Sequence, residues 1–227
     1  MCFSAEASFA GGIIISTIGI ATVTKVHNPS QFVFASIPLF FGLQQFAEGI
    51  LWLTLPRPEY IILQKVVTYW FLIMADVLWP VIIPLAVLLM ETDLKKKRFL
   101  WILFGLGCLL GLYYATCLLL LNVNPKIMGY HIRYNSDFPQ SIAMVAFVIY
   151  LIVTITPLFI SSIKRTRYLG TFMFLSCVVT AIFFTQYLTS VWCFFAALIS
   201  AVIFWILRDS KRKFKFDALN LLKINLK

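Results

Sequence analysis

Three carboxylate side chains fall within segments that are otherwise apolar enough to cross a lipid bilayer: Glu6, Glu48 and Asp76. Placing an ionisable group in hydrocarbon costs roughly 2 to 3 kcal/mol or more, and such groups commonly mark binding sites or proton routes inside a helix bundle. Each carboxylate is therefore a candidate for binding a proton, a cation or a small polar solute.

Two glutamines add polar groups beside Glu48. With helical periodicity, Glu48 lies one turn from both Gln44 and Gln45, on a single face of its helix. Asp76 lies about ten residues from the outer end of its segment, or roughly 15 Å at 1.5 Å per residue, and Glu48 lies at a comparable depth. Glu6 is expected near the outer mouth of the first segment. These five residues are predicted to line one ligand-binding cavity that opens to the outside.

Pro80 supports a polar centre at Asp76. Proline has no N–H group, so the backbone carbonyl of Asp76, four residues earlier, loses its helical hydrogen bond and becomes free to bind a ligand. Kinked helices around a polar centre are found where membrane proteins bind ions or move. The alternative interpretation is that these polar side chains hydrogen-bond across helices and only hold the bundle together.

A membrane enzyme is a second alternative. Glu48, Asp76 and His131 would suit a divalent metal in a hydrolase acting on a lipid-like substrate. The sequence contains no dense metal-ligand spacing and no nucleophile–base motif to support this function. No cofactor is assigned from the sequence.

The amino-acid composition indicates the kind of protein in which these residues must be positioned. The chain has 227 residues, of which 61% are hydrophobic and 12% are charged, and its mean hydropathy is +0.93. Soluble domains carry about 25% charged residues. This composition indicates an integral membrane protein, and it excludes a soluble enzyme, a secreted hydrolase and a nucleic-acid partner.

Seven apolar runs are long enough to span a bilayer. In hydrocarbon the backbone N–H and C=O groups have no water to bind, and a helix satisfies them within one segment. The alternating pattern of membrane barrel strands is not present in these runs. The prediction is an all-α bundle of seven transmembrane helices within residues 1–207, with a basic amphipathic cytoplasmic tail at 208–227. The spans are residues 4–23, 32–55, 66–90, 99–121, 141–160, 169–187 and 191–207.

The basic residues predict the orientation. With the N-terminus outside, 15 Lys and Arg residues fall on the inner side and four on the outer side. Cytoplasmic loops carry such an excess, so the N-terminus is predicted outside and the C-terminus in the cytoplasm. The longest connection, residues 122–140, carries His131 on the outer side and is expected to be a loop that could fold over the mouth of the bundle.

Small residues recur at every fourth position in two spans, and they indicate close helix packing. Packing inside the bundle is the favoured interpretation, while a dimerisation face would make the protein a homo-oligomer. Among the cysteines, Cys2, Cys117 and Cys193 map toward the outer end, where an oxidising compartment would permit a disulfide. The small residues are Ser4, Ser8, Gly12 and Ser16 in the first span, and Gly107, Gly111 and Ala115 in the fourth.

Two segments resemble an uncharacterised family of mostly bacterial multi-helix membrane proteins. They are the run Met1-Cys2-Phe3-Ser4-Ala5, continued by Ala7-Ser8-Phe9, and the set Gln45, Glu48, Gly49 and Trp52. The resemblance implies an integral membrane fold, and the bacterial cytoplasmic membrane is the expected location. It implies no activity, substrate or cofactor.

Three classes of function therefore remain at this point. The first is a transporter, channel-like protein or receptor that binds or moves a small solute, cation or proton at Gln44, Gln45, Glu48 and Asp76. The second is the metal-dependent hydrolase, and the third is a structural membrane subunit.

Overall fold

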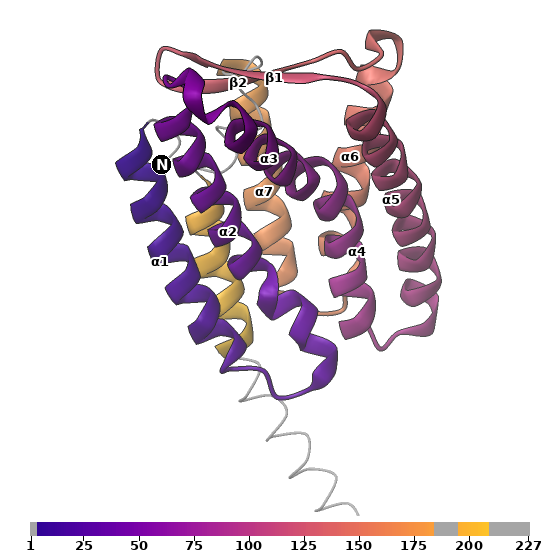
Figure 1. Cartoon of the computed structure of the whole chain (residues 1–227). Helices are drawn as coiled ribbons and strands as arrows, with labels where there is room; N and C mark the ends of the chain where they lie inside the picture. The colour runs from indigo at the N-terminus through magenta and orange to yellow at the C-terminus, as the bar shows by residue number, and fades with distance from the viewer. Residues whose placement is uncertain (1–3, 184–194, 209–227) are drawn as a thin grey trace, which may run out of the picture.

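A computed structural model describes residues 4–183 and 195–208, which form an up-and-down bundle of helices (Figure 1). The bundle contains seven numbered α-helices, and a further apolar helix, Phe195–Arg208, follows residues 184–194. The numbered helices are α1 (Ala5–Val23), α2 (Phe32–Thr54), α3 (Ile61–Leu72), α4 (Trp79–Met90), α5 (Leu94–Leu120), α6 (Gln140–Ile160) and α7 (Thr166–Phe183).

Five of the described helical segments are long and apolar enough to cross a membrane, which confirms the prediction of a helical membrane bundle at this level. The third predicted span is longer than expected, because the helical segment begins at Pro58 and consists of α3, a π-helical segment and α4. The predicted sixth and seventh spans lie partly outside the described residues, and most of the tail does so. The five segments are Ala5–Val23, Pro29–Thr54, Pro58–Met90, Leu94–Leu120 and Ser141–Ile160.

Small residues let α1 and α2 lie close together along their length. A side-chain carbon added at Gly12 would lie 3.1 Å from the ring of Phe46, and one added at Gly49 would lie 3.0 Å from the ring of Phe9. Gly42 faces Ser16 at still closer range. Within the described residues, the small residues of the first span therefore serve packing inside the bundle, as the favoured interpretation predicted.

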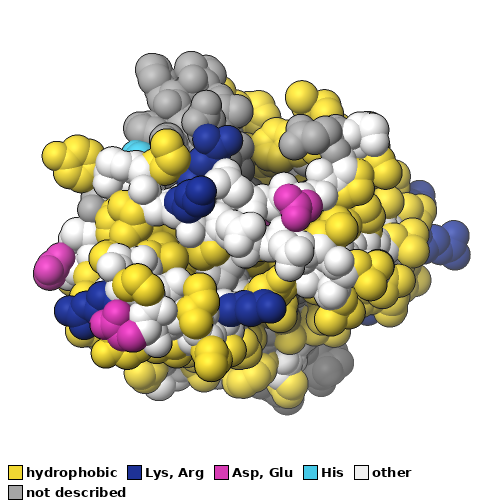
Figure 2. All heavy atoms as spheres, turned by 45° about the horizontal axis from the view of Figure 1, so that its top comes forward, with side chains coloured by type: hydrophobic (Ala, Val, Ile, Leu, Met, Phe, Trp, Pro, Cys, Tyr) yellow, Lys and Arg dark blue, Asp and Glu magenta, His cyan; other side chains and the backbone are white. Residues whose placement is uncertain are grey.

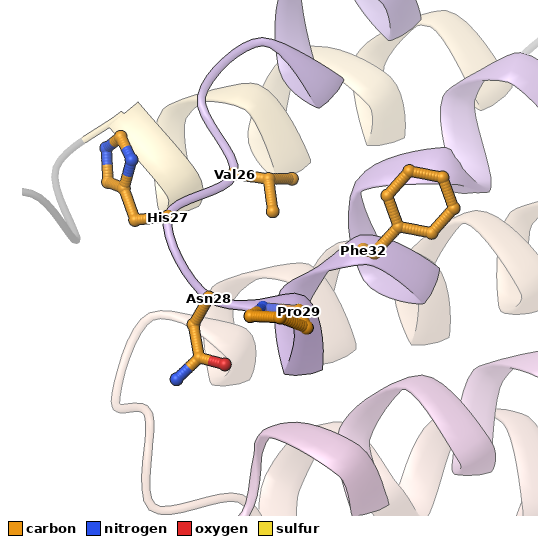
Figure 3. A pocket seen from close by; sticks show the side chains of 5 residues that line it. All are labelled: Val26, His27, Asn28, Pro29 and Phe32. Atoms are coloured by element: carbon orange, nitrogen blue, oxygen red, sulfur yellow. The ribbon is translucent and has the colours of Figure 1, made fainter.

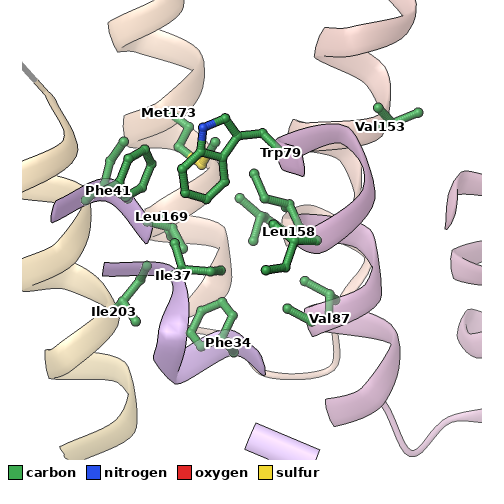
Figure 4. Packing of buried hydrophobic residues seen from close by; sticks show 14 of the residues in the cluster. Phe34, Ile37, Phe41, Trp79, Val87, Val153, Leu158, Leu169, Met173 and Ile203 are labelled. Carbon is green, nitrogen blue, oxygen red and sulfur yellow. The ribbon is translucent and has the colours of Figure 1, made fainter. Parts of the chain in front are cut away.

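A large apolar core, here called the main cluster, fills the centre of the bundle (Figure 4). Phe41 of α2 and Trp79 of α4 stack with ring centroids 4.2 Å apart. Leu158, Met173 and Ile203 add side chains from α6, α7 and the helix Phe195–Arg208. Because this core joins helices from both halves of the chain, it fixes where each helix places its polar residues.

The connection between α5 and α6 is a β-hairpin rather than the loop expected from the sequence. Strand β1 (Val123–Met128) pairs antiparallel with β2 (His131–Ser136), and Gly129 adopts a φ of 61° at the turn. Glycine reaches this left-handed conformation without steric cost. The hairpin lies across one end of the bundle (Figure 1), here called the hairpin end.

The hairpin is held by a second apolar core, here called the cap cluster. Ile132 of β2 is fully buried there, and Phe71 of α3 stacks on Tyr134 with centroids 4.9 Å apart. Burial of these few apolar side chains explains why the otherwise polar connection is ordered. The buried members of the cluster are Ala47, Leu51, Val67, Phe71, Leu72, Ala75, Leu118, Val123 and Ile132.

Glu91 links two connections at the opposite end of the bundle. Its carboxylate accepts hydrogen bonds from the backbone N–H groups of Ser162 (2.7 Å), Thr92 (2.9 Å) and Asp93 (3.0 Å). Burial alone would raise the pKa of Glu91, but these hydrogen bonds outweigh it and hold the pKa below its ordinary value of 4.5. The turn between α4 and α5 is thereby tied to the turn between α6 and α7.

Candidate functional site

A layer of polar side chains lies where the main cluster meets the cap cluster. We call it the polar layer and define it as Gln44, Gln45, Glu48, Asp76 and Tyr150. On α2 the main cluster ends at Phe41 and the cap cluster begins at Ala47, so the polar residues stand between two apolar cores. The exposed fractions of Gln44, Gln45 and Glu48 are 2%, 0% and 0%. Buried polar groups of this kind are costly without partners, which makes their arrangement informative.

Gln44 is joined directly to the helix that follows the π segment. Its side-chain carbonyl accepts a hydrogen bond from the indole N–H of Trp79, at 3.1 Å. The indole ring also stacks on Phe41, so one side chain connects the polar layer to the main cluster. This contact fixes the register of α2 against α4.

Asp76 lies in the π-helical segment Ile73–Leu78, which separates α3 from α4. Pro80 has no N–H to continue the α-helical hydrogen bonding at this point, and local widening is one way in which a helix absorbs that loss. The structure therefore adds a π segment where the sequence indicated a kink and a free carbonyl. Such segments are frequent at functional sites in helices.

Tyr150 is a member of the polar layer that the sequence analysis missed. Its hydroxyl donates a 2.7 Å hydrogen bond to the backbone carbonyl of Ala75, inside the π segment. On α5, Tyr114 interacts electrostatically with Asp76. Neither tyrosine stands out in the sequence, because aromatic residues are abundant in every span and only the packing shows which hydroxyl groups point inward.

Gln44, Gln45, Glu48 and Asp76 lie at the level where the two apolar cores meet, and Glu6 lies outside it. That these residues line one cavity stays a prediction. Glu6 is exposed in the first turn of α1. Ser4 begins that helix, and its hydroxyl accepts a hydrogen bond from the N–H of Ala7 at 3.2 Å. The first turn of a helix favours a negative charge, which gives Glu6 a local role at this position.

His131 lies on β2 at the hairpin end, where its side chain is partly buried. Burial lowers the pKa of this imidazole below its ordinary value of 6.5. Among residues 4–183 and 195–208, no three His, Cys, Asp or Glu side chains are grouped closely enough to hold a metal ion. The trio of Glu48, Asp76 and His131 is therefore not assembled as a metal centre in this part of the chain.

Cys117 is a buried free thiol on α5. Cys2 and Cys193, the other cysteines mapped to the outer end, lie outside the described residues.

A hollow at the opposite end of the bundle involves the other histidine (Figure 3). It is formed at the connection between α1 and α2, and the backbone N–H of His27 there is held by the side chain of Gln31 at 3.2 Å. His27 and His131 therefore lie at opposite ends of the molecule. The lining residues are Val26, His27, Asn28, Pro29 and Phe32.

The fold and the site together define a helical bundle with several apolar helices able to span a membrane and a polar layer whose members on α2 are buried within it. The chain belongs to a family of unknown function, DUF6629, whose family model matches residues 1–217. No curated protein and no solved structure matches the chain. The predicted resemblance to an uncharacterised family is confirmed to this extent.

Proposed function

We propose that this protein is a multi-pass protein of the bacterial cytoplasmic membrane, with its N-terminus and hairpin outside, that binds and moves a proton or a small cation at the polar layer. The observation that carries the proposal is the complete burial of Glu48 beside Gln44 and Gln45 on α2. The π segment with Asp76 lies in the third span, just before Trp79, which is hydrogen-bonded to Gln44. A proton or a hard cation suits this layer because the groups that would hold it are oxygen atoms of carboxylates, amides and a tyrosine hydroxyl.

The chemistry of a buried carboxylate supports this choice of ligand. In a low-dielectric interior a carboxylate is stable when it takes up a proton or lies beside a cation. On proton uptake, an O–H bond forms at the Glu48 carboxylate as one breaks in a hydronium ion, which leaves water. Release to the opposite side reverses these bond changes. The π segment supplies a part of the helix where the backbone hydrogen bonding can change during such a cycle.

The test uses purified protein reconstituted in liposomes, with Glu48→Gln and Asp76→Asn compared with wild type. We expect wild type to show a carboxyl C=O infrared band that responds to pH or to added Na⁺ or K⁺, and proton or cation flux across the vesicle membrane. Both signals should be lost in Glu48→Gln and strongly reduced in Asp76→Asn. Glu59→Gln is the matched control, because Glu59 is exposed in the turn that precedes α3.

Unchanged flux and an unchanged infrared response in both variants would overturn the proposal. The hydrogen bond between Gln44 and Trp79 favours the structural alternative, in which the polar layer only joins helices. That alternative expects lower thermal stability in the variants, with no dependence on ions or pH. Elemental analysis of the same samples tests the hydrolase alternative, which requires a bound metal.

A further inference from the structure

Two buried polar atoms outside the polar layer have no hydrogen-bond partner among the described residues. They are the hydroxyl oxygen of Thr68 on α3 and the indole nitrogen of Trp52 on α2. Thr68 is 0% exposed. Leaving a buried donor or acceptor without a partner costs about 1 to 3 kcal/mol, and nearly all such groups in proteins bind another group or an ordered water.

Thr68 differs from other threonines of this bundle. A threonine in a helix can satisfy its hydroxyl by donating to the carbonyl four residues earlier, and this bond forms at Thr22, Thr54, Thr116, Thr154 and Thr180. Thr68 lies inside α3 and could make the same bond to Gln64, but no hydrogen bond is formed by its hydroxyl in the described structure. The hydroxyl is therefore available for another partner.

Two hydrogen bonds set the level of Thr68 against α2. Near the hairpin end, the side chain of Gln64 donates to the carbonyl of Thr54 at 2.7 Å, and deeper in the bundle Trp79 donates to Gln44. Between these points the antiparallel helices place Thr68, one turn beyond Gln64, within about one helical turn of Trp52 along the bundle axis.

This level lies between the hairpin and the polar layer. Glu48 is one helical turn deeper than Trp52 on α2. On α3, Phe71 follows Thr68 by three residues and stacks on Tyr134 of the hairpin. The two polar atoms thus occupy the part of the cap cluster between the hairpin and Glu48.

We infer that Thr68 and Trp52 bind buried water between α2 and α3 beneath the hairpin, and that this water connects Glu48 with the hairpin end. The indole N–H donates to a water oxygen, and the threonine hydroxyl both donates and accepts. The connecting role rests on the proposed function, whereas the water site stands on the two polar atoms. A proton then moves inward as each water passes one proton on and receives another, so that Glu48 gains the last one.

The test of the water site is NMR of the full-length protein in detergent, with isotope-labelled tryptophan. The indole signal of Trp52 is assigned with Trp52→Phe, and we expect a cross-peak between that indole proton and water. Trp79 is the internal control, because its indole N–H is buried and bonded to Gln44, and we expect no water cross-peak there. Absence of the cross-peak at Trp52 would overturn the water site.

Variants of Thr68 test the partner and the role of the water. Thr68→Val removes the hydroxyl at similar shape and should abolish the Trp52 cross-peak, whereas Thr68→Ser should retain it. Thr154→Val is the matched control, since Thr154 is equally buried but its hydroxyl is bonded to the carbonyl of Tyr150 at 2.7 Å. A cross-peak that persists in Thr68→Val would overturn the assignment to Thr68.

Measurements of proton uptake distinguish a failure of the water connection from a failure of the proposed function. We expect Thr68→Val to slow uptake from the hairpin side while the infrared response of Glu48 is retained. Equal uptake in Thr68→Val and wild type, with Glu48 still responding to pH, would overturn the connecting role. A Trp52 water signal in a protein whose Glu48→Gln variant behaves as wild type would refute the proposed function and leave the water site in place.

Discussion

At the residue scale, burial separates side chains of the same type. Glu6 and Glu48 are both carboxylates in apolar segments, but Glu6 is exposed in the first turn of α1 and Glu48 is fully buried on α2. Burial removes an ionisable group from water and thereby disfavours its charged form. Glu48 and Asp76, rather than Glu6, are therefore the residues on which the proposed function depends.

His131 makes the hairpin sensitive to acid. Burial lowers its pKa in the folded state below the ordinary value of 6.5, so the folded protein binds fewer protons than the unfolded chain between these two values. The contribution of His131 to the free energy of unfolding is fully present above its pKa in the unfolded chain. This contribution is lost as pH drops from about 6.5 toward the lower pKa of His131 in the folded protein. Thermal unfolding measured across this range should show the loss in wild type.

His131→Gln should remove this part of the pH dependence, because glutamine does not titrate. His27→Gln is the control at the opposite end of the bundle, and it should retain the acid sensitivity of wild type. Identical pH profiles for wild type and His131→Gln would contradict the prediction.

At the element scale, glycines allow α5 to pack closely against the helical segment formed by α3, the π segment and α4. Gly107 faces the backbone carbonyl of Pro80, and Gly111 faces that of Val77, which a side-chain carbon would approach to 3.1 Å. These contacts explain the small residues of the fourth predicted span as packing inside the bundle. They also place α5, with Tyr114, beside the π segment.

Gly107→Ala should separate these helices, because the added methyl group would collide with the carbonyl of Pro80 and backbone cannot move as easily as a side chain. We expect a destabilisation of about 1 to 3 kcal/mol, measured by unfolding in mixed detergent. Gly105→Ala is the matched control on the same helix, since nothing lies within 4 Å of the added atom. It should be neutral or stabilising by up to about 1 kcal/mol. Equal effects of the two substitutions would contradict this account of the packing.

At the scale of the whole molecule, the two ends of the bundle differ in charge. The end opposite the hairpin (Figure 1) holds the connections between α1 and α2, α4 and α5, and α6 and α7. These connections and the helix starts beside them carry Lys25, Lys95 to Arg98 and Lys164 to Arg167. At the hairpin end, Arg57 lies between α2 and α3, Lys65 near the start of α3, and Lys126 and Arg133 on the hairpin strands. Viewed toward the hairpin end, charged side chains of both signs are scattered among uncharged and hydrophobic ones (Figure 2). This asymmetry supports the proposed orientation, with the hairpin outside.

Cysteine labelling in intact cells tests the orientation. In a variant whose native cysteines are replaced, Tyr130→Cys at the exposed hairpin tip should react with a membrane-impermeant maleimide. Asn28→Cys, exposed between α1 and α2, should react only after the membrane is permeabilised. The reverse pattern would contradict the orientation. Size measurement of the same purified protein tests the alternative that it forms a homo-oligomer.

The sequence alone determined the features that follow from chemistry along the chain. Long apolar runs predict helices because the backbone must satisfy its own hydrogen bonds in hydrocarbon. Helical periodicity predicts that Gln44, Gln45 and Glu48 lie on one face of their helix. Pro80 marks the irregular point in the third predicted span. These local rules predicted the helical bundle and placed three polar residues on one face of α2.

Only the tertiary structure decided which polar groups meet. It placed Glu6 outside the layer, brought Trp79 to Gln44 and Tyr150 to the carbonyl of Ala75, and ordered residues 123–136 as a hairpin over Phe71. These contacts join residues distant in sequence, and they depend on the packing of several helices in one register. Periodicity within a single helix contains no information about that register, because each segment would be equally helical against other neighbours.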